Sequence, residues 1–445
     1  MSESTSAGGA SGAGASGAKV SKRQLRGEQV PVKAKRIVGP GLVAAGTGVG
    51  AADLVATLVA GSNYGYALLW AAVLGAVLKI VLVEGAGRYS LATGRSIFVG
   101  WRSLGKWTSW YFGPYIVIWG VVYAASATTS SALPIITMFD LDAAWITPIA
   151  IVIAVAVFAL VWANRYTVIE KIMTFFVLVM FIIVIATAIM TAPEIPKILS
   201  GLIPTFTGDG GENVNIIYVL AMAGGVGGTI TLAAYGYWLR EKGWYAPKWM
   251  RVMQIDNTIA YTITGLFVVS VLIIGAELLY TANIALASGD NALIDLARIL
   301  GEEYSGFWGN MFLVGFFAAA VSSVIGVWNG VSLMFADFMG HVRNLPEEHP
   351  DRLNGGKYFK WYLVWLTFPP MLLLFLGQPT GLVLAYGVLG ALFMPFLALT
   401  LLGLLNTKRV PYEWRNGWFT NVMLVLCVGL FGYLAVDNLI GLFTG

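Results

Sequence analysis

Long apolar stretches, separated by short polar segments, run through most of this chain. Eleven of them are long enough to cross a bilayer, for which an α-helix needs about 20 mainly apolar residues. The pattern predicts an all-α polytopic membrane protein with about eleven transmembrane helices. The apolar runs lie at about 40–61, 66–86, 109–136, 144–162, 168–190, 215–239, 254–277, 308–336, 358–376, 380–404 and 419–442.

Composition supports this class and excludes others. The 445 residues are 58% hydrophobic and 11% charged. The single cysteine, Cys427, lies in the last apolar run, and the two histidines, His341 and His349, are expected in one polar loop. No intrachain disulfide and no cysteine- or histidine-based metal cage can therefore form. The spans also lack a Ser/His/Asp or Cys/His set and a phosphate-loop ending, so we predict no catalytic residues and no enzyme.

The charged residues predict the orientation. Residues 1–36 are rich in Ser, Gly and Ala and end in a basic cluster, which predicts a disordered cytoplasmic tail rather than a nucleic-acid-binding segment. With the N-terminus inside, almost all Lys and Arg residues fall on the cytoplasmic side, as the positive-inside rule requires. The sequence thus predicts a multi-pass plasma-membrane protein with its C-terminus outside. The exceptions are Lys79, Lys197 and Arg298.

Two of the apolar runs contain closely spaced glycines. Glycine weakens a helix by about 1 kcal/mol relative to alanine, and a carboxylate at bilayer depth costs about 2.5–3.5 kcal/mol. Close helix packing also uses small residues, but Gly224 to Gly228 contain more glycines than packing needs. We therefore predict that both helices are broken. The residues concerned are Gly46, Gly48, Gly50 and Asp53 in the first run, and Gly224, Gly225, Gly227 and Gly228 in the sixth.

The two glycine-rich runs are five spans apart. This spacing favours an inverted repeat, with the first repeat at 37–190, the second at 191–404 and an additional helix at 405–445. The broken helices would then meet near the centre, with Gly46, Gly48, Gly224 and Gly225 supplying the backbone of the breaks. Their carbonyls and amides, with Asp53 beside them, would face a transported solute. The sequence predicts a secondary transporter that works by alternating access.

Other charges lie within the spans. Lys79 is deep in the second span and needs a partner, either Asp53 or a structural ion pair with Glu84 or Asp337. A pair with Asp53 would compete with a bound cation. Asp256, near an end of the seventh span, is expected to reach the membrane surface by snorkelling.

Short motifs resemble those of the NRAMP family of divalent-metal transporters, in order and spacing, from about residue 37 to the end. The resemblance implies the amino-acid/polyamine/organocation type of fold, which is LeuT-like, and metal transport between pseudo-symmetric halves. The motifs are Gly39-Pro40-Gly41, Arg88, Thr93-Gly94, Ser322-Ser323, Asn329-Gly330, Asp337-Phe338 and Met394-Pro395-Phe396.

The chain departs from the family at the positions that would bind metal. The family's DPGN aligns so that its aspartate becomes Gly50 and its asparagine becomes Asp53. Its sixth-helix MPH aligns with Gly228-Thr229-Ile230, which removes a thioether, and a further histidine aligns with Tyr235. Its tenth-helix glutamine aligns with Tyr386. The third span has no carboxylate, although the family places proton-pathway acids there.

These alignments define a candidate substrate site made of Gly50, Asp53, Gly227, Gly228 and Tyr386, with Asp53 as its metal ligand. One carboxylate with backbone carbonyls, and no sulfur or imidazole, is a hard ligand set that suits magnesium or manganese. We therefore predict transport of a Mg²⁺- or Mn²⁺-like cation, with weak or no proton coupling and no resident cofactor.

A second interpretation uses the same glycines. Exposed helix amides can bind the carboxylate of an amino acid, and Asp53 would then hold its ammonium group. The alternative cargo is thus a small organic solute, an amino acid or an amine. A receptor or scaffold without transport is a third class, which an absence of uptake would identify.

Overall fold

A computed structural model of the chain describes residue 30 and residues 39–444, except 192–193, 209–210, 212, 215, 226–227, 281–290 and 376–378. Side chains are not described at 51–53, 55, 217, 221, 225, 291–293, 379–388, 391, 438–439 and 441–444. Nearly all of the predicted tail, 1–36, thus lies outside the described residues.

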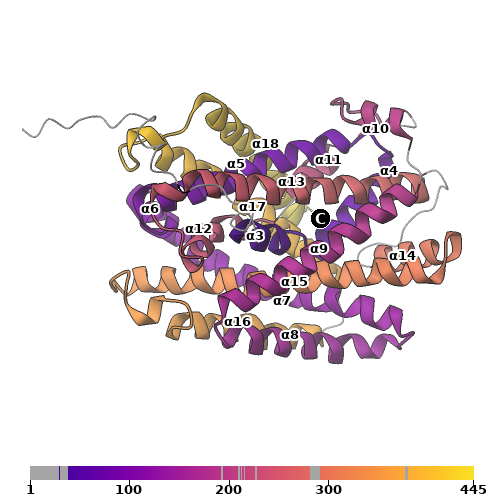
Figure 1. Ribbon diagram of the computed structural model, residues 1–445, viewed down its shortest axis with the longest axis horizontal. Helices are drawn as coiled ribbons and strands as arrows, with labels where there is room; N and C mark the ends of the chain where they lie inside the picture. Colours follow the sequence, from indigo (N-terminus) through magenta and orange to yellow (C-terminus); the bar gives the residue numbers. More distant parts are fainter. Residues whose placement is uncertain are drawn as a thin grey trace, which may run out of the picture.

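The described residues form sixteen α-helices, most of them running along the long axis of the molecule (Figure 1). They are α3 (Pro40–Gly48), α4 (Ala51–Tyr64), α5 (Leu69–Thr93), α6 (Ile97–Leu104), α7 (Trp107–Met138), α8 (Ile146–Trp162), α9 (Tyr166–Met190), α10 (Ile195–Gly201), α11 (Ile216–Gly225), α12 (Thr231–Glu241), α13 (Met250–Gly275), α14 (Asn291–Glu303), α15 (Gly306–Val342), α16 (Lys357–Leu374), α17 (Pro379–Leu405) and α18 (Trp418–Thr444).

Each predicted apolar run coincides with one helix or with a pair of helices. The first run forms α3 and α4, and the sixth forms α11 and α12. By length and composition, seven helices in the described part are apolar enough to cross a membrane. The halves of the broken spans are too short to meet that criterion alone. The prediction of His341 in a loop is wrong, because α15 continues to Val342 and includes it.

The helices pack into two groups. In one group, α7, α8, α15 and α16 contact one another. In the other, α5 and α13 pack against the broken helices α3–α4 and α11–α12. Each group draws helices from corresponding places in the two halves of the chain, which fits the predicted repeats at 37–190 and 191–404. These repeat boundaries stay predictions.

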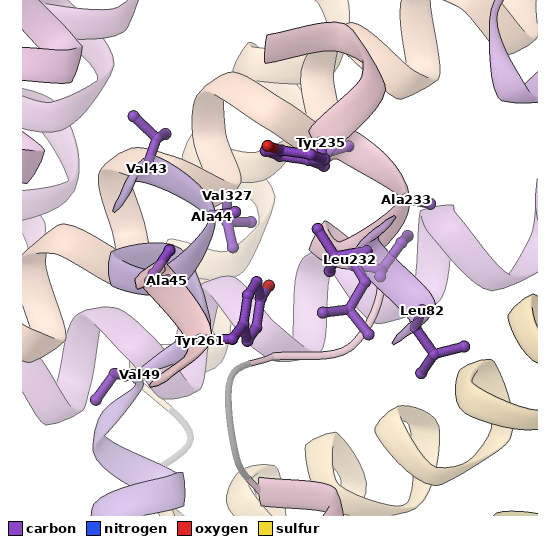
Figure 2. Close-up of a cluster of buried hydrophobic side chains, with 14 of the residues drawn as sticks. Val43, Ala44, Ala45, Val49, Leu82, Leu232, Ala233, Tyr235, Tyr261 and Val327 are labelled. Carbon is purple, nitrogen blue, oxygen red and sulfur yellow. The ribbon is translucent and has the colours of Figure 1, made fainter. Parts of the chain in front are cut away.

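The short helix α3 lies between the groups, with α13 on one side and α15 on the other (Figure 1). Small residues permit the close approach to α15, because a Cβ added at Gly326 would overlap the side chain of Thr47. Figure 2 shows Val43, Ala44 and Ala45 along α3, in the same buried cluster as Tyr261. Tyr261, from α13, is fully buried. The core therefore fixes the end of α3 at the middle of the protein.

Candidate functional site

Both predicted helix breaks are present in the structure. Helix α3 ends at Gly48 and α4 begins at Ala51, while α11 ends at Gly225 and α12 begins at Thr231. Between the latter two, Gly228 has a φ of +80°, a left-handed conformation that glycine adopts at little cost. In the first break only Val49 and Gly50 are non-helical, a shorter stretch than the segment 46–53 in which the sequence predicts the break.

The four glycines assigned to the break backbone lie in the last turns of the helices, not in the non-helical segments. Gly46 and Gly48 end α3, and Gly224 and Gly225 end α11. Weak helix formers at a C-terminus let the helix stop there. Their carbonyls still lack the partners that a continuing helix would provide.

The two breaks are in direct contact. A Cβ placed on Gly228 would lie 2.9 Å from the Cα of Gly48 and 2.8 Å from Oγ1 of Thr231. Only glycine lets the two backbones approach this closely. The end of α3, where the first helix breaks, therefore meets the second break, although the two are distant in sequence.

Hydroxyl groups of α15 bind the carbonyls at the end of α3. Ser322 Oγ lies 3.2 Å from Gly46 O, and Ser323 Oγ lies 2.8 Å from Thr47 O. The hydroxyl of Tyr123, from α7, is 2.6 Å from Ser323 Oγ. This gives the Ser-Ser motif a physical role, since it satisfies backbone groups that the break releases.

Lys79 binds the other break. Its ammonium group is fully buried, donates a hydrogen bond to Gly228 O, and lies 3.5 Å from the Sδ of Met394. The carboxylates predicted as structural partners are engaged elsewhere, Glu84 by Arg88 at 3.1 Å and Asp337 by Arg352. The predicted pair with Glu84 is unfavourable because residues five apart project from different faces of a helix.

The prediction that Asp256 snorkels is wrong. Its side chain is buried, and Oδ2 accepts hydrogen bonds from Gly41 N at 2.7 Å and from the Tyr235 hydroxyl at 2.8 Å. The carboxylate thereby caps the N-terminus of α3, a position that favours negative charge. The position aligned with a family histidine thus serves to tie α12 to α13 and α3.

The structure describes some of the candidate site residues fully, some only by their backbone, and one not at all. Gly50 and Gly228 lie in the two non-helical segments. Asp53 is in the first turn of α4 and Tyr386 is in α17, but neither side chain is among those described. Gly227 lies outside the described residues altogether. Backbone geometry therefore places Asp53 next to the first break.

The structure adds two side chains to the candidate site. The hydroxyl oxygen of Thr229 is buried and has no hydrogen-bond partner within the described part of the chain. A Cβ added at Gly390 of α17 would lie 3.2 Å from the methyl group of Thr229. The sequence signal was available, because Thr229 directly follows the glycine pair. Met394 shows that a sulfur atom lies near the break, so the expectation of a sulfur-free site needs correction.

The described residues contain no group of three or more His, Cys, Asp or Glu side chains that could hold a metal ion.

Comparisons with known proteins bear on both fold and family. A family model described as "Natural resistance-associated macrophage protein-like" (Nramp) matches residues 41–441. The chain is 24% identical to the divalent metal cation transporter MntH of Bacillus subtilis (strain 168), over 90% of this chain and 92% of that protein.

Two solved structures show the fold. A manganese transporter of Eremococcus coleocola, in complex with an aromatic bis-isothiourea substituted compound, superposes with a TM-score of 0.75 at 16% identity, covering 94% of this chain and 90% of that chain. MhsT in complex with L-phenylalanine gives a TM-score of 0.56 at 12% identity, covering 93% and 99%. The predicted LeuT-like fold is confirmed. Because one structure is of a metal transporter and the other holds an amino acid, the fold alone does not select the cargo.

Proposed function

Because the chain belongs to the Nramp family of membrane transporters and is not an enzyme, we propose that it carries a divalent metal cation across the membrane by alternating access. The observation that carries this proposal is the contact between the two helix breaks, where Gly228 lies against Gly48. Broken helices that meet at the centre of a transporter supply backbone groups to a cargo ion.

The ligands we propose are oxygen atoms at this junction. Asp53 supplies the negative charge, and the backbone at Gly50, Gly227 and Gly228 supplies further oxygens, with Tyr386 of α17 as a further candidate. The hydroxyl of Thr229, which has no hydrogen-bond partner among the described residues, is an additional ligand. Oxygen ligands favour Mg²⁺ and Mn²⁺ over Zn²⁺ or Cu²⁺.

The nearby thioether of Met394 moves the balance toward manganese, because softer ligands select against magnesium. The names of the relatives point the same way, since a solved relative is a manganese transporter. We therefore propose Mn²⁺ as the principal cargo and Mg²⁺ as a weaker one.

We further propose that transport proceeds with weak or no proton coupling. Helix α7, the third span, contains no Asp, Glu or His, so it offers no carboxylate relay from this side of the site. The distribution of Lys and Arg supports a cytoplasmic N-terminus and an external C-terminus. The repeats 37–190 and 191–404 would then move relative to one another around the central junction.

Uptake into proteoliposomes tests the proposal. We expect purified protein to admit Mn²⁺ into the vesicles down an inward manganese gradient, with Mg²⁺ competing weakly and an imposed pH gradient changing the initial rate by less than about twofold. Protein-free liposomes are the control. Uptake of an amino acid or an amine without Mn²⁺ uptake would support the second interpretation, and uptake of nothing would indicate a receptor or scaffold.

A further inference from the structure

Lys79 occupies a position at which a transported cation would need to bind. It lies near the middle of α5, is fully buried, and donates a hydrogen bond to Gly228 O, within the second helix break. A positive charge within the hydrocarbon region is costly and is retained mainly at functional sites. Here it binds one of the backbone oxygens that the proposed function assigns to the cargo.

The ammonium and a cargo ion would compete for the same oxygen. Both are cations, and their mutual repulsion in a buried site is much larger than in water. The thioether of Met394, 3.5 Å from the ammonium, borders the same place on the α17 side. A metal ion that binds Gly228 O must therefore displace Lys79 from it.

We propose that Lys79 is a tethered competitor that makes the site selective for divalent over monovalent cations. A monovalent ion that displaces the ammonium replaces one positive charge by another and gains little, whereas a divalent ion interacts about twice as strongly with the carboxylate of Asp53. Na⁺ and K⁺, which are far more abundant, are thereby kept from the site. This inference rests on the proposed function.

The side chain is well suited to this role. Four methylene groups let the ammonium leave the carbonyl without movement of α5, and lysine makes a single-point contact rather than a bidentate one. An arginine would keep the charge at this place, while a methionine would keep length and flexibility without charge. The two substitutions separate charge from packing.

The test compares Lys79→Met, Lys79→Arg and the wild-type protein in Mn²⁺ uptake, with Na⁺ or choline as the external salt. In the wild-type protein, replacement of choline by Na⁺ should leave uptake unchanged. In Lys79→Met, the half-saturating concentration of Mn²⁺ should fall by about tenfold or more, and external Na⁺ should inhibit Mn²⁺ uptake. Lys79→Arg should remain insensitive to Na⁺. Lys171→Met, which removes an exposed lysine at the start of α9, is the matched control.

A purely structural role gives different results. It predicts that Lys79→Met raises the half-saturating concentration and stays insensitive to Na⁺, and either result overturns the inference. If Lys79→Met does not fold, Lys79→Gln with Mn²⁺-dependent thermal stabilisation in Na⁺ and in choline provides the same comparison. Absence of Mn²⁺ uptake by the wild-type protein would instead contradict the proposed function, so the two failures are distinguishable.

Discussion

Replacement of Asp53 by asparagine should reduce Mn²⁺ uptake by about 100-fold, because a lost charged interaction of about 3 kcal/mol corresponds to a factor of that size. Asparagine keeps the shape of the side chain and its carbonyl oxygen but removes the negative charge. Asp53 is the carboxylate in the first turn of α4, directly after the break at Val49 and Gly50. The measurement is the initial rate of Mn²⁺ uptake into proteoliposomes at equal protein content.

Asp142→Asn provides the control for this charge change. Asp142 is exposed between α7 and α8, where its carboxylate accepts a hydrogen bond from Ala144 N at 2.7 Å, and an asparagine can accept the same bond. Its uptake should match that of the wild-type protein. If Asp53→Asn transports at the wild-type rate, Asp53 is not a ligand and the site lies elsewhere.

Replacement of Gly228 by alanine should abolish uptake and lower stability. The left-handed conformation costs a non-glycine residue about 1–2 kcal/mol. In addition, the new Cβ would lie 2.9 Å from Gly48 Cα, so the two breaks must move apart. Separation of the backbones would disrupt the junction that binds the ion. Uptake and the midpoint of thermal unfolding in detergent measure the two effects.

Gly243→Ala isolates the effect of the contact. Gly243 has a φ of +78°, close to that of Gly228, but an added Cβ would meet no atom within 4 Å. The control should lose stability through its backbone conformation alone and keep its uptake. Equal loss of uptake in both variants would show that the contact between the breaks has no special role.

The positions of the breaks could be predicted from sequence because glycine and a buried carboxylate are both unfavourable in a membrane helix. The hydroxyls that bind the α3 carbonyls could not be derived this way, since Ser322 and Ser323 lie far from Gly46 and Thr47 in the chain. Helical periodicity gives no information on which distant helix supplies a donor.

The partner of Lys79 was missed for a related reason. A lysine buried in a membrane span is expected to pair with a carboxylate. A buried ammonium can also bind a backbone carbonyl, and the break leaves Gly228 O accessible to it. Similarly, the position of Asp256 near a span end suggested access to water. Its binding to Gly41 N and Tyr235 depends on how α3 and α12 pack against α13.

Anomalous X-ray diffraction from crystals grown with Mn²⁺ tests the central claim most directly. We predict one manganese peak between the two breaks, with oxygen ligands from Asp53 and from the backbone near Gly228 at about 2.0–2.6 Å. A protein that binds Mn²⁺ only at its surface, with no peak at the junction of Gly48 and Gly228, would contradict it.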